Sequence, residues 1–103
     1  MESPSVLDGQ WARLRSHKRV LTRVDLVVEW EEDRRRRSIP AFTVDVSHSG
    51  CLAVVGADLQ LGTVKLINRE TGREAEARLI WRDPRTWSAG FELSKSDASF
   101  WNL

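Results

Sequence analysis

The chain has 103 residues, of which 30% are charged, and its formal net charge is +1. This length suits one small domain with a single core, and so small a net charge excludes the broad positive field that attracts nucleic acids or anionic membranes. A single cysteine excludes an internal disulfide. Because no apolar run approaches the length of a membrane span and no signal-peptide pattern opens the sequence, we expect a soluble cytoplasmic domain.

The N-terminal part divides into a polar leader and a basic segment. Residues 1–9 are small and polar without periodicity, which predicts a flexible leader ahead of one domain over residues 10–103. The next stretch, Gln10–Thr22, holds four cations and no acid: Arg13, Arg15, Lys18 and Arg19. We expect this basic segment to be flexible too, and to be anchored by Trp11 and Leu14.

Short apolar or alternating runs predict strands along most of the remaining chain. They occur over residues 24–30, 42–46, 51–55, 63–67, 75–81 and 87–93. Within the second run, the period of two places Phe42, Val44 and Val46 on one face and Thr43 and Asp45 on the other. Six short strands separated by turn residues predict an all-β fold, a small antiparallel barrel or sandwich.

One further segment completes the predicted fold. Ser94 or Ser96 is expected to cap a short C-terminal helix whose Phe100 and Trp101 plug one end of the barrel.

The most charged segment of the chain is a block of acid followed by a block of base. Glu29–Asp33 contains four acids and runs directly into Arg34–Arg37. Such a run is most simply a solvated hairpin tip whose charges screen one another. A nucleic-acid-binding patch would require interleaved aromatic residues and a larger positive balance, so we expect neither DNA nor RNA as a partner.

Two polar motifs stand out against this background. The first, Arg15-Ser16-His17-Lys18-Arg19, places two arginines four residues apart just before the first strand. The second, Asp45-Val46-Ser47-His48-Ser49-Gly50, is a polar turn between two apolar strands. The arginine spacing also occurs at Arg19–Arg23, Arg69–Arg73 and Arg78–Arg82, so the order and placement of the motifs carry the information rather than the spacing alone.

In that order, RxxxR followed by a strand and then DxSxxG, the chain resembles the PilZ domain family over roughly Arg13 to Leu93. The resemblance implies a six-stranded split β-barrel that binds the bacterial second messenger cyclic di-GMP. It implies that Arg15 and Arg19 contact the phosphates and guanines, and that Asp45 and Ser47 contact the guanine edge. Gly50 would allow a positive φ and a close approach of the backbone to the base.

The chemistry of these side chains suits such a ligand. The planar fork of arginine binds phosphate bidentately and can also donate to guanine O6 and N7 or stack on a purine. A carboxylate at Asp45 can accept from the N1–H and N2–H groups of guanine, which adenine does not offer. The structural alternative is that Asp45 and Ser47 merely close an Asx or Ser turn.

Several neighbouring residues are secondary candidates. Leu14 occupies the position before the RxxxR element, where an arginine accompanies a stacked ligand pair in the family, so leucine favours one ligand per site. His17, Lys18 and Ser49 are expected at the rim or as electrostatic support. Trp81 could stack on guanine, although an alternating tryptophan is more often part of the core.

Other function classes are less well supported by the sequence. Asp45, Ser47 and His48 lie too close together along the chain to converge as a catalytic relay, and two histidines with one cysteine match no metal-ligand spacing. We therefore expect neither an enzyme nor a cofactor-binding protein. The main rival is a PilZ-like protein-interaction module with weak or no nucleotide binding. Both hypotheses imply a protein partner in trans, because no output domain is visible.

Overall fold

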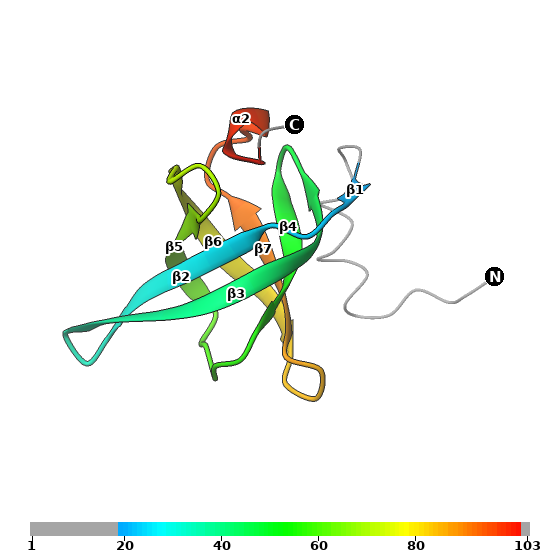
Figure 1. Cartoon of the computed structure of the whole chain (residues 1–103). Coiled ribbons are helices and arrows are strands. Elements are labelled where there is room, and N and C mark those ends of the chain that lie inside the picture. Colours follow the sequence, from blue (N-terminus) through cyan, green and yellow to red (C-terminus); the bar gives the residue numbers. More distant parts are fainter. Residues whose placement is uncertain (1–18, 102–103) are drawn as a thin grey trace.

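Six strands of the chain close into an antiparallel barrel. The computed structural model describes residues 19–101, and its elements are β1 (Val20–Leu21), β2 (Asp25–Glu32), β3 (Arg35–Ser47), β4 (Gly50–Val55), β5 (Gly62–Asn68), β6 (Glu74–Asp83), β7 (Ser88–Leu93) and α2 (Ala98–Trp101). Strands β2–β3–β4–β7–β6–β5 are neighbours in that order, and β5 pairs with β2 to close the ring. The short β1 lies outside the ring and pairs with β3 (Figure 1). The predicted barrel is confirmed.

The core fills the inside of this barrel. Leu26 and Val28 of β2 are fully buried, together with Leu66 of β5 and Phe91 of β7. The alternation predicted for residues 24–30 is confirmed, because Val24 is also buried while the intervening residues are partly exposed.

Two β-bulges change the alternation that the sequence predicts. The β3–β4 register shifts between Thr43 and Asp45, so Val44 has no partner on β4. An extra residue in one strand reverses the facing of the residues beyond it. Thr43 and Val46 are therefore buried whereas Val44 is 41% exposed, and the single face predicted for Phe42, Val44 and Val46 is wrong. A second bulge, between Leu79 and Trp81, leaves Ile80 buried.

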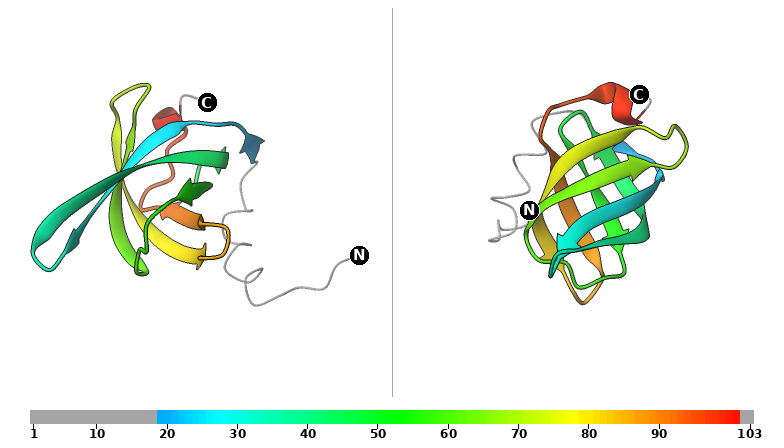
Figure 2. Two further views of the ribbon diagram at one scale, coloured as in Figure 1. Left: turned by 60° about the horizontal axis from the view of Figure 1, so that its bottom comes forward. Right: turned by 90° about the vertical axis from the view of Figure 1, so that its left-hand side faces the viewer.

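The β2–β3 hairpin continues beyond the barrel as a two-stranded arm. Its pairing reaches Glu32 opposite Arg35, whereas β2 pairs with β5 only as far as Glu29 opposite Lys65. Figures 1 and 2 show the arm projecting from the body of the barrel. The predicted hairpin tip is confirmed: Asp33 and Arg34 form a two-residue turn with φ values of 53° and 64°.

The C-terminal end of the described chain plugs one end of the barrel. Phe100 and Trp101 of α2 are buried in the core cluster with their rings edge to face. The Asn68 side chain, itself buried, donates from Nδ2 to the Phe100 carbonyl at 2.7 Å. The helix cap is Asp97, whose carboxylate accepts from the Ser99 backbone, so the cap predicted at Ser94 or Ser96 is wrong. No helix within residues 19–101 is long and apolar enough to cross a bilayer.

Candidate functional site

The candidate site residues fall into two groups. Leu14, Arg15, His17 and Lys18 lie outside the residues that the structure describes. The remaining candidates are all described, and they lie on β3, β4 and β6, on the β3–β4 turn, and just before β1: Arg19, Asp45, Ser47, Ser49, Gly50 and Trp81.

An ion pair joins the two sequence motifs. Arg19, which immediately precedes β1, donates from one terminal nitrogen to Asp45 Oδ2 at 2.8 Å. The Asp45 side chain is only 4% exposed and that of Arg19 is 32% exposed. A pair this poorly hydrated is stronger than a surface salt bridge, because its charges are less screened by water and the bond is charge-assisted. Residues that are 26 positions apart in the sequence therefore meet on the barrel.

The bulge in β3 determines which way Asp45 faces. Asp45 stands opposite Leu52, which is half-buried on the outside of the barrel, whereas Val46 stands opposite the core residue Cys51. Directly paired residues in a sheet share a face. The carboxylate of Asp45 therefore points outward, onto the surface that Arg19 covers. Without the extra residue at Val44, the alternation from Thr43 would place Asp45 and Val46 on the opposite faces.

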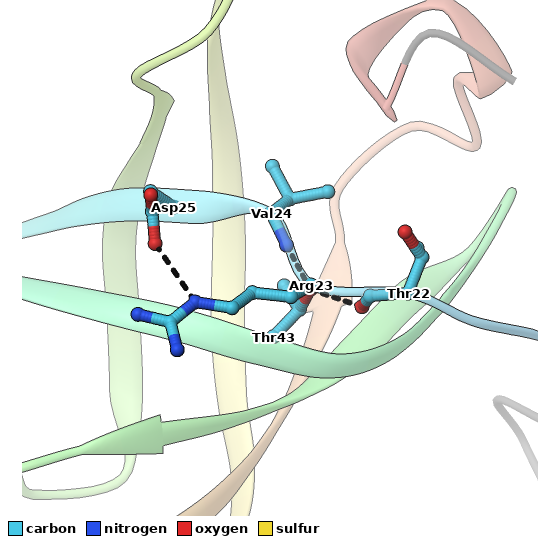
Figure 3. A network of polar contacts seen from close by, with 5 residues as sticks. All are labelled: Thr22, Arg23, Val24, Asp25 and Thr43. Carbon is cyan, nitrogen blue, oxygen red and sulfur yellow. Dashed lines mark hydrogen bonds and ion pairs between the residues drawn. The ribbon is translucent and has the colours of Figure 1, made fainter.

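A buried threonine fixes the path of the chain from β1 into β2. Thr43 Oγ1 accepts from the Val24 amide and donates to the Thr22 carbonyl, both at 2.7 Å (Figure 3). These two hydrogen bonds hold the chain in a kink at Arg23, which belongs to neither strand. On the two sides of this kink, β1 and β2 pair with the same edge of β3. This kink places β1 beside Val46 and Asp45 and so brings Arg19 to the carboxylate.

Arg23 shows why spacing alone does not define the site. It forms a second RxxxR pair with Arg19, but its guanidinium lies 4.3 Å from the centre of the Phe42 ring. Its Nε also donates to Asp25 at 3.2 Å, in an ion pair that is largely exposed (Figure 3). Arg23 therefore belongs to the β2–β3 surface rather than to the surface around Asp45.

The β3–β4 turn contains a local serine motif. Ser47 Oγ accepts from the Ser49 amide at 3.2 Å, and the two buried hydroxyls lie 3.2 Å apart. The Ser turn that was the structural alternative to a binding role thus forms at Ser47, whereas Asp45 forms an ion pair with Arg19 instead. Gly50 lies in β4 opposite Ser47, and it is not one of the described residues that have a positive φ. The positive φ expected at Gly50 is wrong because the turn is made by His48 and Ser49.

The outward side of Asp45 continues as a row of residues across four strands. Asp45 stands opposite Leu52, Leu52 opposite Gly90, and Gly90 opposite Trp81. At the usual strand spacing this row spans about 14 Å. Trp81 is half-buried and is not part of the core cluster, so the core position favoured by the sequence is wrong. Gly90, which carries no side chain and is itself buried, lies in this row between Leu52 and the indole.

A parallel row borders a hollow that the sequence did not reveal. Ser47 pairs with Gly50, Gly50 with Glu92, and Glu92 with Arg78. Ser49, Arg78 and Glu92 line a hollow of about 440 Å³, a size typical of small-ligand sites. The alternation in β6 indicates that Arg78 faces outward, but only closure of the barrel brings it near the motif turn.

Two observations limit the chemistry of this surface. Burial, followed by the nearby charge of Asp45, raises the pKa of the Cys51 thiol far above its ordinary value, so Cys51 is an inert core residue. Within residues 19–101, no group of three or more histidine, cysteine or acidic side chains could hold a metal ion.

Comparisons with known proteins do not assign this arrangement to a family. No protein-family model matches the chain, and no curated protein matches it.

Proposed function

We propose that this domain is a receptor for cyclic di-GMP, of the PilZ type, that relays the second messenger to a partner protein. The observation that supports the proposal most directly is the Arg19–Asp45 ion pair. It places one guanidinium of the RxxxR element within 2.8 Å of the carboxylate of the DxSxxG element, on the outer face of the barrel. A guanine phosphate ligand needs both groups, a cation for the phosphate and an acceptor for the base edge.

The roles of the described residues follow from their positions. Asp45 accepts from the guanine N1–H and N2–H groups, and Arg19 exchanges part of its contact with Asp45 for a phosphate or for guanine O6 and N7. Ser47 and Ser49 contribute hydroxyls at the neighbouring turn. Trp81, three strands away along the row through Gly90, offers a ring for stacking at the far side of the ligand. Arg15 joins Arg19 in this proposal through the motif alone.

The same ion pair also favours a second candidate function. Removing one partner of a poorly hydrated pair leaves an unpaired charge, so Arg19 and Asp45 could serve only to hold β1 against β3. The domain would then be a PilZ-like protein-interaction module with weak or no nucleotide binding.

Calorimetric titration of the full chain separates these candidates. The receptor hypothesis predicts saturable binding of cyclic di-GMP, with cyclic di-AMP and GTP binding far more weakly because Asp45 selects the guanine edge. A stoichiometry of one ligand per chain agrees with leucine at position 14. Equal binding of the two cyclic dinucleotides would show that the base edge is not read. No binding and no thermal stabilisation by cyclic di-GMP would leave the interaction module.

A further inference from the structure

The barrel wall opens where the arm leaves it. Strands β2 and β5 pair from Leu26–Asn68 to Glu29–Lys65 and then separate, because β2 continues along β3 into the arm. Beyond this point Glu31 of β2 and Thr63 of β5 face each other across a gap, which we call the β2–β5 split. A groove of about 530 Å³ lies along one side of the split, between the arm and the β4–β5 loop. A second hollow of about 570 Å³ lies on its other side.

The split exposes backbone hydrogen-bonding groups from both strands. In an antiparallel ladder the residues of one strand direct their N–H and C=O groups alternately to its two neighbours. The Arg69 amide donates to the Asp25 carbonyl, and the Thr43 amide donates to the Val24 carbonyl, so odd-numbered residues of β2 face β5 and even-numbered ones face β3. Glu31 therefore directs its N–H and C=O into the split.

Thr63 completes this arrangement from the other strand. The same register places Thr63 where the next partner of Glu31 would be, but the ladder ends one pair earlier, at Glu29 and Lys65. Two strand edges thus face each other with unused pairing positions. This geometry is suited to an extended segment that inserts between them and adds a strand.

The side chains around the groove define the chemistry of such a segment. The lining contains four carboxylates, Glu31, Glu32, Asp33 and Asp58, and neither lysine nor arginine. Glu32 and Asp58 have arginine partners at 3.8 and 2.6 Å, whereas Glu31 and Asp33 have no ion pair within the described residues. The apolar part of the lining includes the half-buried Trp30 and the side chain of Leu61, which is 62% exposed.

We propose that the β2–β5 split is a docking site for an extended, basic segment of a partner protein. The segment pairs with the backbone of Glu31 and Thr63, its basic side chains face the carboxylates, and an apolar side chain packs on Trp30. This inference rests on the proposed function, because a receptor of this kind requires contact with a partner protein and the split supplies that contact. The split lies on the arm side of the barrel, away from β1 (Figures 1 and 2).

A second copy of the chain is the less suitable occupant. Three residues of its basic run, Arg35, Arg36 and Arg37, already belong to β3 and pair with β2 in the arm, and Arg37 lies 3.8 Å from Glu32. Insertion of this run into a neighbour would break the β2–β3 strand pairing of the arm. A free basic segment of another protein makes the same interactions without that loss.

The test is a titration of the isotopically labelled full chain with short synthetic peptides, followed by amide NMR and without any nucleotide. The probe is a capped peptide in which lysine alternates with valine. We expect saturable binding in which the Glu31 and Thr63 amides shift and exchange more slowly with solvent. A peptide with glutamate in place of lysine tests the charge requirement, and a backbone N-methylated peptide tests strand addition. Both should fail to bind.

Variants of the protein provide the matched control. Glu31→Gln combined with Asp33→Asn preserves the shape of the arm and should weaken lysine-peptide binding about tenfold. Glu70→Gln, on the β5–β6 turn at the other end of the barrel, should change nothing. Binding that persists with the N-methylated peptide, or that leaves the Glu31 and Thr63 amides unmoved, would overturn the proposal. So would self-association of the chain that Glu31→Gln and Asp33→Asn abolish, because the split would then hold a second copy. A failed titration with cyclic di-GMP leaves the peptide result standing, so the two proposals fail separately.

Discussion

Replacing Thr43 by valine tests the kink that brings the two motifs together. Valine retains the shape of threonine and its preference for strands, but it removes the hydroxyl that accepts from the Val24 amide and donates to the Thr22 carbonyl, each at 2.7 Å. The Thr43 side chain is buried, so little water can replace it. The substitution therefore leaves one backbone donor and one backbone acceptor without their partner.

The expected cost follows from these two groups. An unpaired buried polar group costs about 1–3 kcal/mol, and the Thr22 carbonyl is only partly buried, so we expect the free energy of unfolding to fall by about 2–4 kcal/mol. Thr43→Ser is the matched control, because it retains the hydroxyl and removes one methyl group at a cost of about 1 kcal/mol. The valine variant should therefore be the less stable of the two, although it is the more hydrophobic.

Urea unfolding followed by tryptophan fluorescence measures both variants. With a typical slope for a small domain, the valine variant should lower the midpoint by roughly 1–3 M. The Arg19–Asp45 contact should loosen in the same variant, because β1 loses its fixed connection to β2. A valine variant as stable as the wild type, or more stable than the serine variant, would contradict the role assigned to the hydroxyl.

Two further predictions concern stability. Arg34→Gly should stabilise the protein by roughly 0.5–1 kcal/mol, because glycine adopts the positive φ of 64° in the arm turn without the strain of an L side chain. The control variant Arg36→Gly, within β3, should destabilise the protein. A lower Tm for Arg34→Gly than for the wild type would contradict this account. The raised pKa of Cys51 means that the unfolded thiol ionises near its ordinary value of 9.0 while the folded thiol stays neutral. Stability should therefore be intact below pH 9 and should fall above it, by up to about 1.4 kcal/mol per pH unit relative to Cys51→Ala; parallel pH profiles for the two proteins would refute this.

Much of the fold could be predicted from local patterns, and the errors have a common cause. The alternation of Val24, Leu26 and Val28 identified a strand with one buried face because nothing interrupts β2 there. The same reasoning failed at Val44, where a bulge adds one residue and reverses the facing of the chain, and a second bulge interrupts the alternation at Ile80. A bulge is set by the pairing between strands, and the sequence of one strand does not contain that information.

The candidate site was predictable only in part. Arg19 and Asp45 carry the two motifs, and the ion pair between them was within reach of motif reasoning. Arg78 and Glu92 could not be found in this way, because they approach the motif turn only through the cross-strand order of the closed barrel. The β2–β5 split was equally hidden, since it depends on where two strands separate. The sequence shows which residues form the strands but not where their pairing ends.

The most direct test of the proposed receptor compares two arginine variants by calorimetric titration with cyclic di-GMP. Both arginines belong to an RxxxR spacing, but only Arg19 contacts Asp45, whereas Arg23 lies over Phe42. Arg19→Ala removes at least one charge-assisted contact and should weaken binding roughly tenfold or more, while Arg23→Ala should bind like the wild type. Unchanged binding by Arg19→Ala, or an equal loss in both variants, would contradict the site.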